Sequence, residues 1–225
     1  MTQRRFWDEP DTVERFANRE PDRRLVELLE RFPEPAITRV LDLGCAAGRN
    51  TVLLTALGFD VQAVDSSMAM VTRTRARVAK SAGPDAAERR VHLAAMDDLG
   101  AFTDELFHLV VALGVYHNAR TPEEWDAAIA ETRRVMVPGG LLLVADFGRR
   151  ARVDGTPLEP VPGLPSVYEG LPSGRVFLLE ADDLDTALAE RGLFPECPTE
   201  TVQTTRSSGC RVTVNGLYRK GEPLR

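Results

Sequence analysis

Residues 40–50 read VLDLGCAAGRN, an apolar run that ends in an acid and is followed by a turn of very small residues. The run has the character of a buried strand, and the residues from Arg49 onward have that of a helix. Between them, Gly44 to Gly48 removes side-chain volume. Two interpretations of this stretch are open. Its glycines allow a tight strand-to-helix turn, or its backbone is left without large side chains so that a ligand can lie against it.

Strands and helices alternate along most of the chain. Apolar patterns predict strands at 37–43, 59–65, 89–95, 106–113 and 141–147, and helices at 11–18, 22–32, 49–57, 66–82 and 121–136. This alternation predicts right-handed crossovers and an α/β fold with a parallel sheet covered on both faces. The chain then continues into a helix at 181–191 and two alternating strands at 199–207 and 210–220, joined by a turn at Ser208-Gly209.

The long connection at 148–176 interrupts this rhythm, because it contains five prolines and five glycines and shows little periodicity. We expect it to be a lid or binding loop between the fifth strand and the last helix. Residues 1–35 are expected to form a helical cap, and the whole of 1–225 a single domain. Four further side chains are left open between a site role and plain packing or exposure: Phe6, Trp7, Tyr168 and Arg175.

Composition restricts the classes of function. The chain of 225 residues is 43% apolar and 28% charged, as in soluble globular proteins. Its net charge of −6 argues against nucleic-acid binding, and no run is long enough to cross a membrane. The three cysteines and three histidines are too scattered for a metal site. The N-terminus lacks the apolar core of a signal peptide, so a cytoplasmic location is expected. The sequence predicts no oligomeric state.

Three strand ends carry side chains suited to one ligand. The small-residue turn follows the first strand, and Asp65 ends the second strand, 17 residues after Gly48. A carboxylate at this position can accept both hydroxyls of a ribose. Met96 and Asp97 follow the third strand and could contact an adenine, with Asp98 as the rival acceptor. Because open α/β sheets bind ligands at the carboxyl ends of their strands, an adenosine-containing ligand is expected there.

The glycine spacing separates two kinds of cofactor. The nicotinamide fingerprint GxGxxG fails at two of its three positions, which Gly44, Ala46 and Arg49 occupy. The stretch instead resembles DxGxGxG, the first motif of class I S-adenosylmethionine-dependent methyltransferases. Ala46 replaces the middle glycine, a mild departure if its backbone dihedrals are ordinary. FHLVVALGVYHN (107–118) and RRVMVPGGLLLVADF (133–147) are similar to later motifs of the family.

The resemblance implies a Rossmann-like, doubly wound, mostly parallel seven-stranded sheet with an antiparallel C-terminal hairpin strand. It implies S-adenosyl-L-methionine as cofactor, S-adenosyl-L-homocysteine as product and a small-molecule acceptor. The small tellurite-resistance-like enzymes look most similar. The cofactor-binding residues it implies are Asp42, Gly44, Cys45, Ala46, Gly48, Asn50, Asp65, Ser66, Met96, Asp97 and Leu113.

His117 is the candidate catalytic residue, because it follows the fourth strand, where the resemblance places the transferable methyl group. As a general base it would serve a hydroxyl or ammonium acceptor, whereas a thiol, selenium or tellurium anion would need no base. The alternatives for His117 are that it orients the substrate, that it contacts the cofactor, or that it is a solvated loop residue. The same alternatives are open for Tyr116 and Asn118. Two rival functions are considered: a sensor that binds the cofactor without turnover, and a macromolecular methyltransferase.

Overall fold

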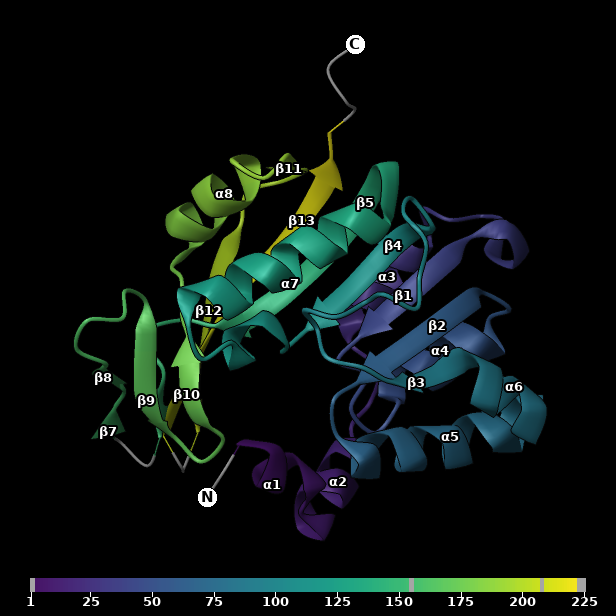
Figure 1. Ribbon diagram of the computed structural model, residues 1–225, viewed down its shortest axis with the longest axis horizontal. Helices are drawn as coiled ribbons and strands as arrows, with labels where there is room; N and C mark the ends of the chain where they lie inside the picture. The colour runs from purple at the N-terminus through teal and green to yellow at the C-terminus, as the bar shows by residue number, and fades with distance from the viewer. Residues whose placement is uncertain (1–2, 154–155, 207–208, 222–225) are drawn as a thin grey trace.

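The computed structural model describes residues 3–153, 156–206 and 209–221. Its main sheet has the strand order β3-β2-β1-β4-β5-β13, with β12 also paired to β13 (Figure 1). All neighbours from β3 to β5 are parallel, and β13 runs antiparallel to both β5 and β12. These seven strands are β1 (Arg39–Leu43), β2 (Asp60–Asp65), β3 (Val91–Leu93), β4 (Phe107–Leu113), β5 (Met136–Phe147), β12 (Glu200–Arg206) and β13 (Gly209–Lys220). The expected Rossmann-like sheet with an antiparallel hairpin strand is therefore confirmed.

Helices cover both faces of this sheet (Figure 1). Leu41, Val110 and Leu142 point to one face, where they pack with α7 (Pro122–Val135) and α8 (Ala181–Ala189). Val40, Leu109 and Leu141 point to the other, against α3 (Arg23–Leu29) and α4 (Arg49–Ala56). α5 (Met68–Ala82) packs over β2 and β3 on this second face. Alternate residues of each strand thus enter two separate cores, which explains why the strands are apolar throughout.

Several boundaries differ from those expected. α6 (Pro84–Arg90) follows α5 without a loop and takes the first two residues predicted for the third strand. Gly83 has φ +87° and ends α5, while the fixed φ of Pro84 suits the first position of a new helix. β5 begins at Met136, five residues before the strand predicted at 141–147, and so includes Pro138, Gly139 and Gly140. The short β11 (Leu193–Pro195), paired to β13, is not among the elements expected from the sequence.

Residues 148–176 are not the irregular loop expected from the sequence. They form β6 (Arg152–Val153) and β7 (Thr156–Pro157), which extend the main sheet, and β8 (Glu159–Pro160), β9 (Val167–Leu171) and β10 (Gly174–Phe177), which make a separate antiparallel sheet. Leu158, Val167 and Val176 are buried there. Strands this short, interrupted by proline and glycine, leave no alternating pattern to detect. The expected hairpin turn at Ser208-Gly209 lies partly outside the described residues.

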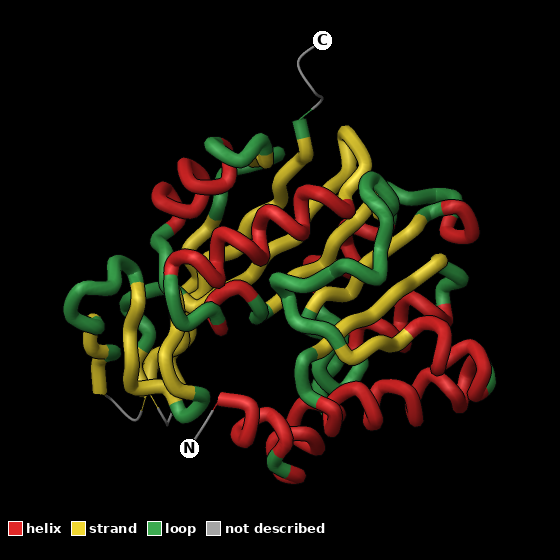
Figure 2. Tube along the Cα trace, viewed as in Figure 1, coloured by secondary structure: helices red, strands yellow, loops and turns green. Residues whose placement is uncertain are grey.

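Two structures flank the carboxyl ends of the parallel strands. One is the small sheet β8–β10, and the other is the N-terminal pair α1 (Gln3–Asp8) and α2 (Pro10–Ala17) (Figure 2). Two short 3₁₀ helices, η1 (Pro35–Ile37) and η2 (Tyr116–Asn118), precede β1 and follow β4. Within the described ranges, no helix combines the length and apolar character that crossing a bilayer requires.

Candidate active site

The turn after β1 brings the backbone close to its neighbours. A Cβ on Gly44, which has φ +66°, would lie 1.8 Å from Val115 Cγ2. One on Gly48, at φ +80°, would lie 2.7 Å from Thr74 Cγ2. Both positions therefore need glycine for space as well as for conformation. Ala46 has φ +47°, so its replacement of glycine is not the mild departure expected: an alanine is held in the left-handed region.

Asp65 is held by the backbone on either side of it. Its Oδ2 accepts a hydrogen bond from the Ala46 N–H at 2.8 Å, and its Oδ1 accepts one from the Ser67 N–H at 2.9 Å. Burial raises the pKa of Asp65 above its usual range, and these two hydrogen bonds act in the opposite direction. The carboxylate is thereby fixed at the end of β2, and its remaining lone pairs can accept hydrogen bonds from a ligand.

Asp42, near the end of β1, is the most buried carboxylate of the site, with 2% of its surface exposed. Its Oδ2 accepts a hydrogen bond of 2.5 Å from Thr51 Oγ1 on α4. Burial raises the pKa of Asp42 to about 6, although the Thr51 hydrogen bond and the charge of Arg49 lower it. A carboxylate with this environment is stabilised by any cation that binds beside it.

One cavity of about 820 Å³ connects these groups. This volume is near the upper end of the range for small-molecule sites, about 300–1,000 Å³, and leaves room for more than one ligand. All the site residues predicted from the sequence except Gly48 line this cavity. They are Asp42, Gly44, Cys45, Ala46, Asn50, Asp65, Ser66, Met96, Asp97, Leu113 and His117.

The structure divides the other candidate residues into those that line the cavity and those that do not. Asp98 and Asn118 also line the cavity. Tyr116 is fully buried, and its hydroxyl pairs with Thr132 Oγ1 on α7 at 2.8 Å, so it belongs to the core. Neither Tyr168 nor Arg175 lines the cavity. Among the described residues of the 148–176 segment, Leu171, Pro172 and Ser173 line the cavity, at the turn between β9 and β10.

Cys45 lies in the small-residue turn and lines the cavity, but its surroundings disfavour the reactive thiolate form. Its side chain is buried, and its Sγ lies 4.0 Å from Thr74 Oγ1. Burial raises the pKa of the Cys45 thiol well above its usual range, and the charges of Asp65 and Asp42 add to this. The small side chain therefore serves the packing of the turn.

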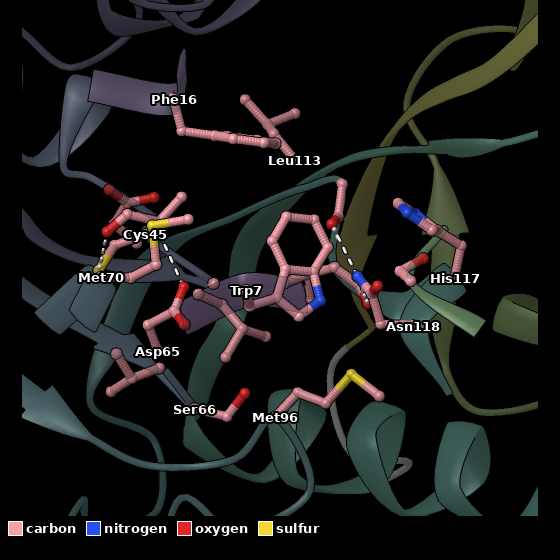
Figure 3. Close-up of a pocket in the computed structure, with 18 of the residues that line it drawn as sticks. Trp7, Phe16, Cys45, Asp65, Ser66, Met70, Met96, Leu113, His117 and Asn118 are labelled. Carbon is pink, nitrogen blue, oxygen red and sulfur yellow. Dashed lines mark hydrogen bonds between the residues drawn. The ribbon is translucent and has the colours of Figure 1, made fainter. Parts of the chain in front are cut away.

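The N-terminal helices form one wall of the cavity. Ser67 Oγ donates to Asp8 Oδ1 at 2.6 Å and fastens α1 to the start of α5. Trp7 makes edge contacts with Phe6 and Phe16, and all three rings line the cavity. Figure 3 shows the Trp7 indole between the side that carries Asp65 and the side that carries His117. The sequence alone leaves Phe6 and Trp7 undecided between packing and a site role.

His117 forms a buried pair with Asp146, a residue that the sequence analysis does not identify. His117 lies in η2 after β4, and Asp146 lies near the end of β5. Nδ1 of the imidazole is 2.9 Å from Asp146 Oδ1, and the His117 backbone N–H donates to the same oxygen at 3.3 Å. An ionised Asp146 accepts from Nδ1–H, which leaves the lone pair of the neutral ring on Nε2. Asp146 could have been found by the rule that identified Asp42 and Asp65, since all three lie at the carboxyl ends of strands.

In the described part of the chain, no group of three or more His, Cys, Asp or Glu side chains is placed to hold a metal ion. The polar groups of the cavity are instead distributed along the strand ends, as is typical of a site for an extended organic ligand.

Comparison with known proteins identifies the family. Residues 40–140 match the model of a methyltransferase domain. The chain is also 31% identical over 209 residues to 27-O-demethylrifamycin SV methyltransferase of Amycolatopsis mediterranei, an alignment that covers 90% of this chain and 70% of the relative. The chain belongs to the class I S-adenosylmethionine-dependent methyltransferases. This methyltransferase is also 30% identical over 160 residues to demethylmenaquinone methyltransferase of Parafrankia, of which it spans 62%.

Solved structures agree with this methyltransferase in fold. A 1,6-didemethyltoxoflavin-N1-methyltransferase of Burkholderia thailandensis, bound to S-adenosylhomocysteine, aligns over 97% of this chain and 82% of its own, with a TM-score of 0.64 and 20% identity. A protein of Methanosarcina mazei described as a methyltransferase aligns over 91% and 100%, with a TM-score of 0.67 and 16% identity. S-adenosylmethionine is the cofactor of this enzyme. None of these comparisons bears on the expected likeness to tellurite-resistance enzymes.

Proposed function

We propose that this enzyme methylates a hydroxyl group of a small molecule, with His117 as the base that removes the hydroxyl proton. The observation that carries the proposal is the buried His117–Asp146 pair at the ends of β4 and β5, of which His117 lines the cavity. When bound, S-adenosylmethionine supplies a methyl group that its sulfonium already makes electrophilic. What the chain must add is binding, alignment, exclusion of water and a place for the proton.

The cofactor is assigned to the half of the cavity near β1, β2 and β3. Asp65 would accept the ribose hydroxyls with the lone pairs that Ala46 and Ser67 do not use. Met96 and Leu113 would cover the faces of the adenine, and Asp97 would accept from its exocyclic amine. Asp42 would offset the positive charges of the methionine part. These donors and acceptors have the chemistry that the parts of the cofactor need, so the residues present fit it.

His117 is suited to a hydroxyl acceptor because Asp146 fixes which ring nitrogen carries the proton. With Nδ1–H directed to Asp146 Oδ1, the lone pair of Nε2 can accept a proton as the acceptor oxygen attacks. The Asp146 charge then stabilises the imidazolium that forms. A thiolate acceptor would need neither residue, so a buried histidine–carboxylate pair favours oxygen over sulfur.

The relatives give independent support for oxygen. The names of 27-O-demethylrifamycin SV methyltransferase and of the ubiquinone biosynthesis O-methyltransferase of Brucella anthropi both refer to O-methyl chemistry. The second relative is 28% identical over 158 residues and is spanned to only 59% of its length, so its acceptor does not transfer to this chain.

The test is a screen of matched acceptors that differ only in the nucleophile. Phenols, the corresponding thiophenols and anilines are incubated with enzyme and S-adenosylmethionine, and the S-adenosylhomocysteine and the methylated products are identified by mass spectrometry. The proposal expects O-methyl products. Methylation of sulfur or nitrogen alone would contradict it. Tight cofactor binding without S-adenosylhomocysteine from any acceptor would favour the sensor.

A further inference from the structure

We infer that the acceptor carries a second, neutral polar oxygen besides its reacting hydroxyl, and that the hydroxyl of Ser173 binds this oxygen. The inference rests on the proposed function for the place of the reacting hydroxyl at His117. It names a specificity-determining residue in the turn between β9 and β10, a segment to which the cofactor assignment gives no role.

Three cavity-lining side chains with nitrogen or oxygen atoms, apart from the carboxylate of Asp42, are almost completely buried. Asn50, His117 and Ser173 expose 5%, 5% and 6% of their surface. Asn50 Oδ1 accepts a hydrogen bond of 3.0 Å from the Asp22 backbone N–H, and His117 is paired with Asp146 through Nδ1. The hydroxyl of Ser173 makes no hydrogen bond to any described part of the chain. Ser173 therefore stands apart from the other two.

The oxygen of Ser173 is open to the cavity. It is not among the described polar atoms that protein covers completely, although the residue as a whole is buried, so its free surface faces the space that the residue lines. Serine in a turn commonly bonds to nearby backbone, but this hydroxyl does not, so turn formation does not account for it. A hydroxyl taken out of bulk water without a partner is costly, and a ligand oxygen that pairs with it recovers the cost.

The turn is attached to the part of the cavity that contains His117. Ser173 directly precedes β10, and β10 packs against η2, the 3₁₀ helix that carries His117. Phe177 of β10 also shares one apolar core with Val115 and Tyr116, the two residues before His117. An acceptor whose hydroxyl reaches His117 can therefore present a second group to Ser173 without entering the cofactor half of the cavity.

Aromatic rings form walls of the same cavity. The Phe147 ring centre lies 4.7 Å from that of His117 and 5.5 Å from Arg211 Cζ, so this ring is held from two sides. Trp7 and Phe16 contact each other edge to face, with ring centres 5.4 Å apart, and both line the cavity. Aromatic walls of this kind pack on planar ligands. A flat acceptor with two polar groups on its rim fits these walls and the two polar side chains.

The surroundings of Ser173 make its hydroxyl selective. Leu171 and Pro172, the other residues of the turn that line the cavity, contribute apolar side chains, and proline has no backbone N–H to donate. A serine hydroxyl can donate to a carbonyl oxygen or exchange hydrogen bonds with another hydroxyl. An apolar substituent would leave it unpaired, and sites built to hydrogen-bond a ligand reject analogues that lack the partner. A carbonyl or hydroxyl group is thus the substituent that Ser173 favours.

The experiment measures binding rather than turnover. The probes are the three ring isomers of hydroxyacetophenone, the carbinols obtained by reducing them, and the matching isopropenylphenols, in which a methylene group replaces the carbonyl oxygen. Each is titrated by calorimetry into enzyme saturated with S-adenosylhomocysteine. For at least one isomer, the affinity of the ketone or carbinol relative to the isopropenylphenol should be at least about fivefold higher in wild-type enzyme than in Ser173→Ala. The affinity for S-adenosylhomocysteine should be the same in both.

The matched control is Ser166→Ala. Ser166 belongs to the same segment, accepts a hydrogen bond of 3.2 Å from Arg149 Nη2 and does not line the cavity, so this variant should keep the wild-type affinity ratio. An unchanged ratio in Ser173→Ala, an equal change in Ser166→Ala, or no binding of any probe would each overturn the inference. No methyl transfer is needed, so a ratio that depends on Ser173 in an enzyme that forms no O-methyl product would contradict the proposed function alone.

Discussion

Asp65 Oδ2 accepts a 2.8 Å hydrogen bond from the backbone N–H of Ala46, and this contact joins the end of β2 to the turn after β1. The carboxylate assigned to the ribose therefore also fixes the conformation of the turn that faces the cofactor. Ala46 holds φ +47°, a conformation that costs a non-glycine residue about 1 kcal/mol or more. Ligand binding and local backbone geometry consequently depend on one side chain.

Removal of the Asp65 carboxylate should weaken cofactor binding. Asp65→Ala loses its charged hydrogen bonds to the ribose, a total of about 1.5–3 kcal/mol, so the affinity for S-adenosylhomocysteine should fall by about tenfold to hundredfold. Calorimetry measures the affinity, and circular dichroism checks that the variant is folded. Asp60→Ala, at the exposed start of the same strand, is the control and should bind normally. An unchanged affinity in folded Asp65→Ala would disprove the ribose assignment.

Ala46→Gly tests the strain in the turn. Glycine adopts the left-handed conformation without steric cost but gains entropy in the unfolded chain, so the variant should be between unchanged and about 1 kcal/mol more stable. Ala46→Val adds a β-branched side chain at the same φ and should lose more than about 1 kcal/mol. Urea denaturation measures both. A clear loss of stability in Ala46→Gly would show that the alanine is not strained.

Asp42 should make stability depend on pH. Its pKa in the folded protein is about 6, above the ordinary 3.8, so the ionised form is the one that the fold disfavours. The free energy of unfolding is then highest below the ordinary pKa, and about 3 kcal/mol is lost as the pH rises through about 6. Asp42→Asn cannot ionise. The unfolding free energies of the two ligand-free proteins are measured from about pH 4 to about pH 7. Their difference should change by an amount on the order of 3 kcal/mol over this range. A constant difference would contradict the burial argument.

The β9–β10 turn should influence the acceptor and not the cofactor. Leu171, Pro172 and Ser173 line the cavity, whereas Leu158 and Val167 of the same segment are buried in the fold. Replacing the whole segment by a flexible linker would expose this core, so a single change is the sharper test. Ser173→Phe should narrow the acceptor side, raise KM for the acceptor and leave cofactor affinity intact. If Ser173→Phe and wild-type enzyme have the same kinetic constants for every acceptor of the screen, the turn has no role in selecting the acceptor.

Asp146 is expected to act as a positioning residue. Asp146→Asn keeps the shape of the side chain and removes its charge, so the imidazolium formed during proton transfer loses its partner. Turnover of a phenol should fall by about 10²–10⁴, the loss expected when a catalytic histidine no longer has a carboxylate to orient and stabilise it. Turnover of the matching thiophenol, already ionised in water, should change little. Equal losses on both acceptors would indicate a structural effect.

The sequence was sufficient for the parts of this fold that depend on local patterns. The strand that carries Asp42, the helix expected at 121–136 and the position of Asp65 at a strand end all follow from apolar periodicity. It could not reveal the sheet within 148–176, because strands of two to five residues leave no periodicity. Nor could it pair His117 with Asp146 or Phe147 with Arg211. These contacts join residues 29 and 64 positions apart and depend on strand register, which one sequence does not specify.

The most direct test of the account is the rate of methyl transfer from S-adenosylmethionine to a phenol by His117→Ala, measured in a single turnover beside wild-type enzyme. Without the base, the rate should fall by about 10²–10⁴ while the affinity for S-adenosylhomocysteine stays within about twofold. His92→Gln, a histidine outside the cavity, should retain the wild-type rate. A His117→Ala enzyme that methylates the phenol at the wild-type rate would contradict the central claim.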